Sequence, residues 1–347
     1  MHVQNKRFFS ILCQKPHRVL LMSQDYKVFA RKDTNEMSVT SRTGIKSGGY
    51  AAMMGSVQKR LNIIKSKLKN DQYLKYSIWS DVAHEVFKHY GRFKEDIKKK
   101  MKIEKIDDLS RVEIEGRVVY WPAKADVTRL VDMYFEVFNE DNNHYFDIPE
   151  MKVKPGDFVL DCGACEGYFT LKALESGAAK VYCLEPGDAI TKCLHKSFAS
   201  EVQTGKVLIY SYLIGDKNET VRFYDHPSDP TVCQVCQQDQ EIITDTCLQN
   251  REMLTIDDFC LNHAIKKVDF IKADIEGGEV GLVYGAAKTI RKCRPSLAIA
   301  VYHAPENANL IVDFIEKLSL GYKIRVKGIV DFEGVPRPVM VHCYHTN

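Results

Sequence analysis

Residues 161–170 read Asp161-Cys162-Gly163-Ala164-Cys165-Glu166-Gly167-Tyr168-Phe169-Thr170. They lie between a short apolar run, 158–160, and a segment with helical periodicity, 168–176, so they predict a turn from a buried strand into a helix. The two glycines let the backbone approach a ligand closely because they carry no Cβ atom, and a helix start presents free N–H groups. The spacing Asp-x-Gly-x-x-x-Gly fits poorly with the dinucleotide fingerprint, which requires a third glycine.

Short apolar segments alternate with helical segments on both sides of this turn. We expect strands at 158–160, 180–184, 207–214, 268–273, 297–302, 322–326 and 339–344, and helices at 168–176, 187–200, 279–291 and 306–319. This alternation predicts an α/β fold with a doubly wound, mostly parallel seven-stranded sheet. Such a sheet binds ligands at the carboxyl ends of its strands, so residues just after strands are the candidates for chemistry.

An acidic residue ends the second predicted strand, 24 residues after Asp161, in the pair Glu185-Pro186. A carboxylate at this place can accept hydrogen bonds from both hydroxyls of a ribose. The combination of this residue with the 161–170 turn predicts a nucleoside-bearing cofactor. The residues alone leave two candidates, a dinucleotide and S-adenosylmethionine.

Three further polar residues follow later strands of the predicted sheet. Asp274 and Glu276 leave the fourth strand, and His303 leaves the fifth in the run Ala300-Val301-Tyr302-His303. Carboxyl ends of parallel strands share one edge of a sheet, so we expect the three side chains in one crevice. A histidine beside two carboxylates is a candidate general base.

Together these segments resemble the FkbM family of S-adenosylmethionine-dependent methyltransferases, from about residue 153 to residue 326. Order and spacing agree in the segments 154–157, 161–170, 185–186, 254–259, 268–279, 299–303 and 320–322. Two positions depart from the family pattern. Cys165 stands where asparagine is usual, which puts one cofactor hydrogen bond in doubt, and Gly278 stands where alanine is usual.

The resemblance implies a class I, Rossmann-like methyltransferase that binds S-adenosylmethionine and methylates a hydroxyl of a sugar, glycan or other small molecule. It implies His303 or Asp274 as the base and Glu276 as a residue that positions the acceptor or the base. Glu185 is expected to hold the ribose, and Asp216 to approach the adenine amino group. The implied cofactor-binding set is Asp161, Gly163, Ala164, Cys165, Gly167, Tyr168, Phe169, Glu185, Pro186, Asp216 and Asp274. No metal is expected.

The charge is unevenly distributed along the 347 residues, although the total is only +3. Residues 1–110 carry 23 basic and 11 acidic residues, a net of +12, and the remainder carries a net of −9. We expect an irregular tail at 1–55, a basic helical accessory segment at 56–110, a lead-in hairpin and helix at 111–150, and the methyltransferase domain at 151–347. The basic part favours an anionic surface or partner. The N-terminal helices and the insertion at 217–253 are expected to build the acceptor pocket.

Eleven cysteines, an odd number, favour reduced thiols in a cytoplasmic protein over a disulfide scaffold. Cys233 and Cys236 could contribute to a zinc site, but one clean pair falls short of the usual four ligands. No apolar run is long enough to span a membrane. Residues 1–24 contain no acidic residue and have a weak mitochondrial-transit character.

Other functions remain open from the sequence. A methyltransferase acting on RNA or protein would use the basic N-terminal part to steer an anionic substrate. The chain could also be a binding protein that has kept the sheet and lost catalysis. The altered residue Cys165 in the turn supports this alternative. A nicotinamide-dependent dehydrogenase is disfavoured by the spacing from Asp161 to Gly167.

Overall fold

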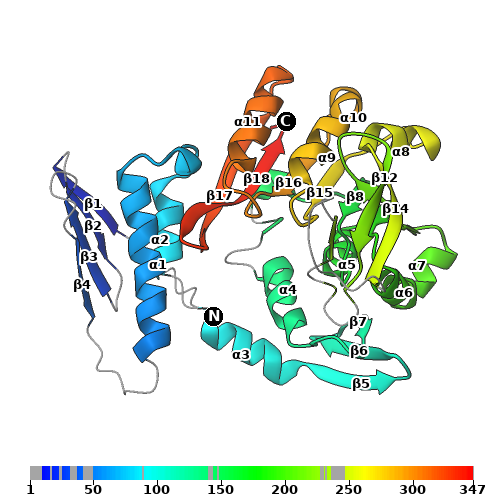
Figure 1. The fold of residues 1–347 in the computed structure, drawn as a ribbon, viewed down its shortest axis with the longest axis horizontal. Helices are drawn as coiled ribbons and strands as arrows, with labels where there is room; N and C mark the ends of the chain where they lie inside the picture. Colours follow the sequence, from blue (N-terminus) through cyan, green and yellow to red (C-terminus); the bar gives the residue numbers. More distant parts are fainter. Residues whose placement is uncertain are drawn as a thin grey trace. The chain divides into compact units, whose positions relative to one another are not determined.

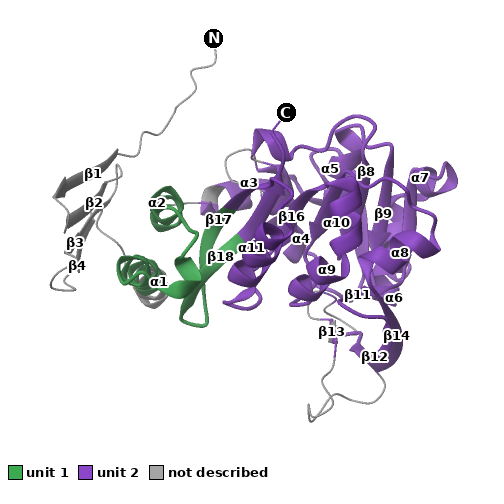
Figure 2. Cartoon of the chain, turned by 90° about the horizontal axis from the view of Figure 1, so that it is seen from above, with its two compact units in different colours: residues 1–89, 326–339 green, residues 90–325, 340–347 purple. Residues whose placement is uncertain are grey.

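The structure is a computed structural model of the 347-residue chain (Figure 1). It describes residues 10–15, 18–22, 26–31, 37–41, 50–87, 90–139, 144–146, 148–226, 230, 233–235 and 247–346. The chain divides into two compact units (Figure 2). One contains residues 1–89 and 326–339, and the other contains residues 90–325 and 340–347.

A seven-stranded sheet, of which the first five strands lie wholly in the larger unit, confirms the predicted fold class. Its strand order is β10 (Val207–Tyr210), β9 (Lys180–Leu184), β8 (Phe158–Cys162), β15 (Phe270–Ala273), β16 (Ser296–Ala300), β18 (Val335–Tyr344) and β17 (Lys323–Phe332). The first five strands pair in parallel, and β18 pairs antiparallel with β16. Residues 326–339 at the turn of the last two strands belong to the smaller unit.

The central strands are apolar along their whole length because both faces of the sheet are covered. Leu160, Ile271 and Ile299 are each 0% exposed. The described helices that follow β8 in this unit are α5 (Tyr168–Glu175), α6 (Asp188–Ser197), α7 (Ala199–Gln203), α8 (Ile256–Asn262), α9 (Glu279–Gly285), α10 (Ala287–Cys293) and α11 (Asn307–Lys317). Helix α9 packs on α8 and α11, and α5 packs on β8 and β9.

The predicted strand at 207–214 is divided between two sheets. Its first half is β10, whereas β11 (Leu213–Ile214) leaves the large sheet and pairs in parallel with β14 (Leu248–Leu254). A second four-stranded sheet results, with the order β11, β14, β12 (Glu219–Tyr224) and β13 (Gln234–Val235). This sheet contains the described part of the 217–253 insertion.

The segment before the large sheet contains the predicted hairpin and helix. Strands β6 (Leu109–Ile114) and β7 (Arg117–Pro122) meet at Glu115-Gly116, whose φ angles of 51° and 83° are those of a tight hairpin turn. Helix α4 (Arg129–Phe138) begins after Thr128, whose N–H and hydroxyl donate to Asp126. Helix α3 (Gly91–Lys100), strand β5 (Lys102–Ile106) and a short 3₁₀ turn (Pro149–Met151) complete this segment.

The smaller unit contains α1 (Tyr50–Leu68), a 3₁₀ turn (Gln72–Leu74) and α2 (Trp79–Phe87), as the helical periodicity of this region indicated. Its core includes Ile63, Ile64, Val82 and Ile329, each 0–1% exposed. The structure also has an antiparallel sheet of β1 (Ser10–Lys15), β2 (Arg18–Met22), β3 (Tyr26–Arg31) and β4 (Met37–Ser41), in the segment for which the sequence predicts an irregular tail. The division between the units at residues 89 and 90 also differs from the boundaries expected from the sequence. None of the helices in the described ranges is long and apolar enough to cross a bilayer.

Because the side chains of the central strands are buried, we expect truncation of one of them to lower the free energy of unfolding. Ile299→Ala in β16 removes a fully buried side chain, so we expect the free energy of unfolding to fall by about 2–5 kcal/mol. Leu261→Ala is the control because Leu261 is 75% exposed, and we expect a change within about 0.5 kcal/mol. Urea denaturation followed by circular dichroism measures both. Equal losses in the two variants would contradict this account of the core.

Candidate functional site

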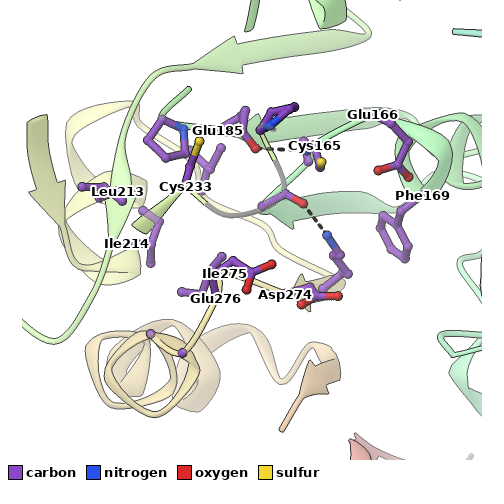
Figure 3. Close-up of a pocket in the computed structure, with 18 of the residues that line it drawn as sticks. Cys165, Glu166, Phe169, Glu185, Leu213, Ile214, Cys233, Asp274, Ile275 and Glu276 are labelled. Carbon is purple, nitrogen blue, oxygen red and sulfur yellow. Dashed lines mark hydrogen bonds between the residues drawn. The ribbon is translucent and has the colours of Figure 1, made fainter. Parts of the chain in front are cut away.

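A cavity of about 560 Å³ opens where β8, β9 and β15 end (Figure 3). Residues 163–166 and Phe169 line it from the 161–170 turn, and residues 184–186 line it from the end of β9. Residues 274–278 contribute from the loop after β15, and Tyr302 contributes from the end of β16. Met133, Glu136 and Val137 of α4, Tyr145, Lys272, and the second sheet with its neighbouring loops complete the wall. The cavity therefore lies where the topology of a parallel sheet places a ligand.

The turn after β8 is fixed by a buried ion pair. The ammonium of Lys272 lies 3.2 Å from Asp161 Oδ1 and donates to the carbonyl of Gly163 at 2.6 Å. Asp161 also accepts a 2.6 Å hydrogen bond from the Thr170 hydroxyl at the start of α5. Asp161 is 0% exposed and is not part of the cavity wall. The structure therefore places this predicted cofactor residue behind the turn, where it shapes the backbone.

Glycine at 163 is required by a close approach of two loops. A Cβ atom there would lie 1.9 Å from the carbonyl oxygen of Asp274, and the residue has φ +75°. Gly167 has φ +89°, and a Cβ atom there would lie 2.6 Å from the ring of Phe198. Gly167 and Tyr168 do not line the cavity, and Tyr168 is 0% exposed. Gly163 thus allows the turn to pack against the loop after β15, and Gly167 adopts the positive φ angle that precedes α5.

Cys165, one of the two positions that depart from the family pattern, lies in the left-handed region with φ +42°. Asparagine tolerates this conformation better than most residues, which gives a backbone reason for asparagine at this position. The Cys165 N–H donates to Glu185 Oε2 at 3.1 Å. The backbone contact to the end of β9 is therefore made without an asparagine side chain.

Glu185 joins the turn to the end of β9. Besides the bond from Cys165, its Oε1 accepts the N–H of Gly187 at 3.0 Å, and the residue is 8% exposed. Burial raises the pKa of the Glu185 carboxyl to about 7, although the two N–H donors act in the opposite direction. Its carboxylate lies in the cavity wall, on the opposite side from Asp274 and Glu276 in Figure 3.

A second group of polar side chains surrounds the ring of His303. Its Nδ1 lies 2.9 Å from Glu279 Oε1, and its Nε2 lies 3.7 Å from Asp274 Oδ1 and 3.4 Å from Glu276 Oε2. Burial alone would lower the pKa of His303, but the three carboxylates outweigh it and raise the pKa to about 10. Asp274 and Glu276 line the cavity, whereas His303 lies behind them. The structure thus brings together all three predicted catalytic residues.

The positions of Asp274 and Glu279 are fixed by further hydrogen bonds. The Tyr145 hydroxyl donates to Asp274 Oδ2 at 3.1 Å, and the Tyr302 hydroxyl lies 3.4 Å from Oδ1. Glu279 Oε1 accepts the N–H groups of Ile275 and Gly277. The loop after β15 is therefore folded around the buried Glu279 carboxylate.

Glu136 and Tyr145 are among the cavity residues that were not identified from the sequence. Glu136 lies on α4 and Tyr145 lies after it, and neither belongs to a motif. Surrounding protein raises the pKa of Glu136 to about 8 even though 39% of its side chain is exposed, and the negative charge of Asp274 adds to this effect. Burial also raises the pKa of Glu166 to about 7. In the sequence Glu136 is one polar position of an amphipathic helix, so no local signal marked it.

Asp216 does not line the cavity. Its backbone N–H lies against Gly281 of α9, where a Cβ atom would be 3.3 Å away. Tyr212, Leu213 and Ile214 of the same segment reach the wall instead. The cavity wall therefore gives no support to the predicted contact of Asp216 with an adenine.

The cysteine pair of the insertion is only partly within the described residues. Cys233 lines the cavity and accepts the N–H of His226 at 3.2 Å, whereas Cys236 lies outside the described residues. Burial raises the pKa of the Cys233 thiol to about 12. Within the described ranges, no cysteine belongs to a group of side chains close enough to share a metal ion.

Comparisons with known proteins agree with this geometry. The family model described as methyltransferase FkbM domain matches residues 161–324. None of the curated proteins matches the chain.

Three solved structures illustrate the likeness in fold. A methyltransferase FkbM from Methylobacillus flagellatus is 16% identical, with a TM-score of 0.40, and the match covers 85% of this chain and 59% of that chain. Trm5b from Pyrococcus abyssi is 12% identical, with a TM-score of 0.35 and coverage of 70% and 62%. TYW2 from M. jannaschii, solved with AdoMet, is 12% identical, with a TM-score of 0.35 and coverage of 69% and 87%. The chain thus spans less than two thirds of the length of the first two proteins.

Likenesses at these TM-scores carry no argument about substrate, so the assignment rests on the family model and on the motifs that the cavity brings together. Residues 161–324 form a methyltransferase domain of the FkbM family.

Proposed function

We propose that the chain transfers the methyl group of S-adenosylmethionine to a hydroxyl of a sugar, glycan or other small-molecule acceptor. One observation carries the proposal. A single cavity at the carboxyl ends of the parallel strands has the 163–169 turn and Glu185 in its wall, and Asp274 and Glu276 lie across from Glu185. A nucleoside-bearing donor and an acceptor can therefore meet in one cavity.

The residues of the cavity fit the cofactor. The close-packed backbone of Gly163 and Ala164 would line its methionine end, and Glu185 would accept hydrogen bonds from the ribose. Pro186, Leu213 and Ile214 offer an apolar surface for the base. Bound S-adenosylmethionine supplies a methyl group on a sulfonium, which is already an activated leaving group.

The acceptor side is assigned to Asp274, Glu276 and His303. With the cofactor bound, the acceptor oxygen would bond to the methyl carbon as the carbon–sulfur bond broke, and the bonding electrons would stay on sulfur. The hydroxyl proton needs a base, and Asp274 is the proposed base because its carboxylate reaches the cavity. His303 is held between carboxylates behind the wall, so it acts as a positioning residue.

The charge of the wall bears on the class of acceptor. It contains the carboxyl groups of Glu136, Glu166, Glu185, Asp274 and Glu276, and the ammonium of Lys272. That ammonium is engaged with Asp161 and the Gly163 carbonyl. The described part of the wall therefore offers a phosphate backbone carboxyl groups and no free ammonium, so it favours a neutral acceptor such as a sugar over RNA.

The proposed function predicts acceptor-dependent turnover. The full chain, incubated with S-adenosylmethionine and a panel of glycans, lipid-linked sugars and small alcohols, is expected to form S-adenosylhomocysteine with at least one acceptor. Mass spectrometry is expected to show one added methyl group, attached to oxygen, on the product. Turnover with RNA alone, weakened by rising salt, would contradict the proposed acceptor class.

The contact at Gly163 predicts a loss of cofactor binding on Gly163→Ala. The added methyl group would clash with the Asp274 carbonyl and move the turn, so we expect S-adenosylhomocysteine to bind at least tenfold more weakly by calorimetry. Gly156→Ala is the matched control because Gly156 also has positive φ but has nothing within 4 Å of its Cβ position. Both variants carry about 1–2 kcal/mol of backbone strain. If Gly156→Ala weakened binding as much, the close approach would not be the cause.

The proposed base predicts a selective loss of turnover on Asp274→Asn. The amide cannot accept the acceptor proton, so we expect kcat to fall by about 10²–10⁴-fold while S-adenosylhomocysteine affinity changes by only a few fold. Glu316→Gln, an exposed substitution on α11, is the control and should keep both values. Unchanged kcat in Asp274→Asn would remove this residue from the mechanism.

A further inference from the structure

Three side chains next to the cavity have the arrangement of metal ligands. Asp274, Glu279 and His303 each present one ligand atom, and these atoms all lie within 4.8 Å of one another. They come from three separate elements: the loop after β15, the first residue of α9 and the segment after β16. Carboxylate oxygens and an imidazole nitrogen suit divalent cations such as Mn²⁺.

Carboxyl groups outnumber the imidazole around His303. Asp274, Glu276 and Glu279 surround the ring; Asp274 and Glu279 are largely buried and Glu276 is 48% exposed, and the ammonium of Lys272 also acts on Asp274. Side-chain exposure is 0% for Glu279, 12% for His303 and 19% for Asp274. Excess charge at such sites is costly unless it is paired with an opposite charge or coordinates a metal.

An independent observation comes from the far oxygen of Glu279. Its Oε1 is occupied by the N–H groups of Ile275 and Gly277, whereas Oε2 is buried and has no hydrogen-bond partner among the described residues. A buried carboxylate oxygen of this kind is a strong acceptor that lacks its donor. A cation bound by the cluster would supply the missing interaction.

The side chains are also held in place by the kind of outer hydrogen bonds that orient metal ligands. The Tyr145 hydroxyl donates to Oδ2 of Asp274, and two backbone N–H groups hold Oε1 of Glu279. Such outer contacts fix the direction of a ligand and raise the affinity of a site. The cluster is therefore preorganised on the rigid end of the sheet.

We propose that Asp274, Glu279 and His303 form a binding site for one divalent cation of the Mn²⁺ type, with Glu276 as a further ligand at the cavity side. Its place next to the cavity puts the cation where the acceptor hydroxyl is proposed to bind, so this role rests on the proposed function. A cation that held the acceptor oxygen would lower the pKa of the hydroxyl, whose proton would leave to water. Asp274 would then act as a ligand of the cation and would no longer act as the base.

The competing account is an ion-pair network that needs no metal. In that account His303 Nδ1 donates to Glu279 Oε1 at 2.9 Å, and the imidazolium alone offsets the carboxylates. The two accounts differ in one measurable property, the affinity of the folded protein for a cation in the absence of cofactor and acceptor.

The test uses the full chain, purified without a metal-binding tag, treated with a chelator and exchanged into chelator-free buffer. Titration with Mn²⁺, followed by calorimetry and by electron paramagnetic resonance of the free ion, is expected to show one site per chain. His303→Gln and Glu276→Gln are expected to weaken Mn²⁺ binding at least tenfold. Glu276 is 48% exposed, so its substitution keeps the test valid if the His303 variant fails to fold.

Glu306→Gln is the matched control, because Glu306 is an exposed carboxylate three residues after His303, and it should bind Mn²⁺ as the wild type does. S-adenosylhomocysteine binding, measured separately, reports whether each variant retains its cofactor site. Absence of Mn²⁺ binding by the wild type, or equal affinity in the wild type and in Glu276→Gln, would overturn the metal site. Either result would leave the proposed methyl transfer standing, since neither measurement involves an acceptor.

Discussion

The buried ion pair between Lys272 and Asp161 is the interaction on which the cavity depends. The two residues are register partners on the paired central strands β15 and β8, and their side chains are 6% and 0% exposed. Burial lowers the pKa of the Lys272 ammonium, but the charge of Asp161 and of other carboxylates outweighs it and raises the pKa above its usual range. Removing one partner of such a pair typically costs about 3–5 kcal/mol because the other charge stays buried.

This pair controls the backbone as well as the charge. Lys272 also donates to the Gly163 carbonyl, and Asp161 accepts from Thr170, so the beginning and the end of the 161–170 turn are attached to the two central strands. Glu185 then attaches Cys165 of the same turn to β9. Three neighbouring strands therefore determine where the turn lies, and a ligand in the cavity meets backbone that is already in place.

Much of the larger unit could be predicted from the sequence because its signals are local. The 161–170 turn, the acidic residue at the end of β9 and the residues after β15 and β16 follow from apolar runs and from their spacing. Asp274, Glu276 and His303 meet because parallel strands end at the same edge of a sheet. That general property made their proximity predictable without a structure.

What could not be predicted depends on packing between distant segments. Glu136 reaches the cavity only because α4 lies over the strand ends, and nothing in its neighbourhood in the sequence marks it. Asp161 follows the expected pattern, but the pattern does not reveal that its carboxylate points to Lys272. The break between Tyr210 and Leu213 is hidden too, since both halves are apolar and only the pairing of β11 with β14 separates them.

The proposed cofactor side and the proposed acceptor side of the cavity both involve the backbone at Asp274. Asp274 contributes its side chain to the cluster around His303, while its carbonyl oxygen lies where a Cβ atom of residue 163 would be. The carbonyl and the carboxylate belong to the same residue, so a displacement of the turn moves the acceptor-side carboxylate as well. Positions in methyl transfer must be held to within a fraction of an ångström for an in-line attack. The contact between Gly163 and Asp274 therefore couples the turn in the proposed cofactor site to the carboxylate in the proposed acceptor site, through the backbone and without a flexible side chain between them.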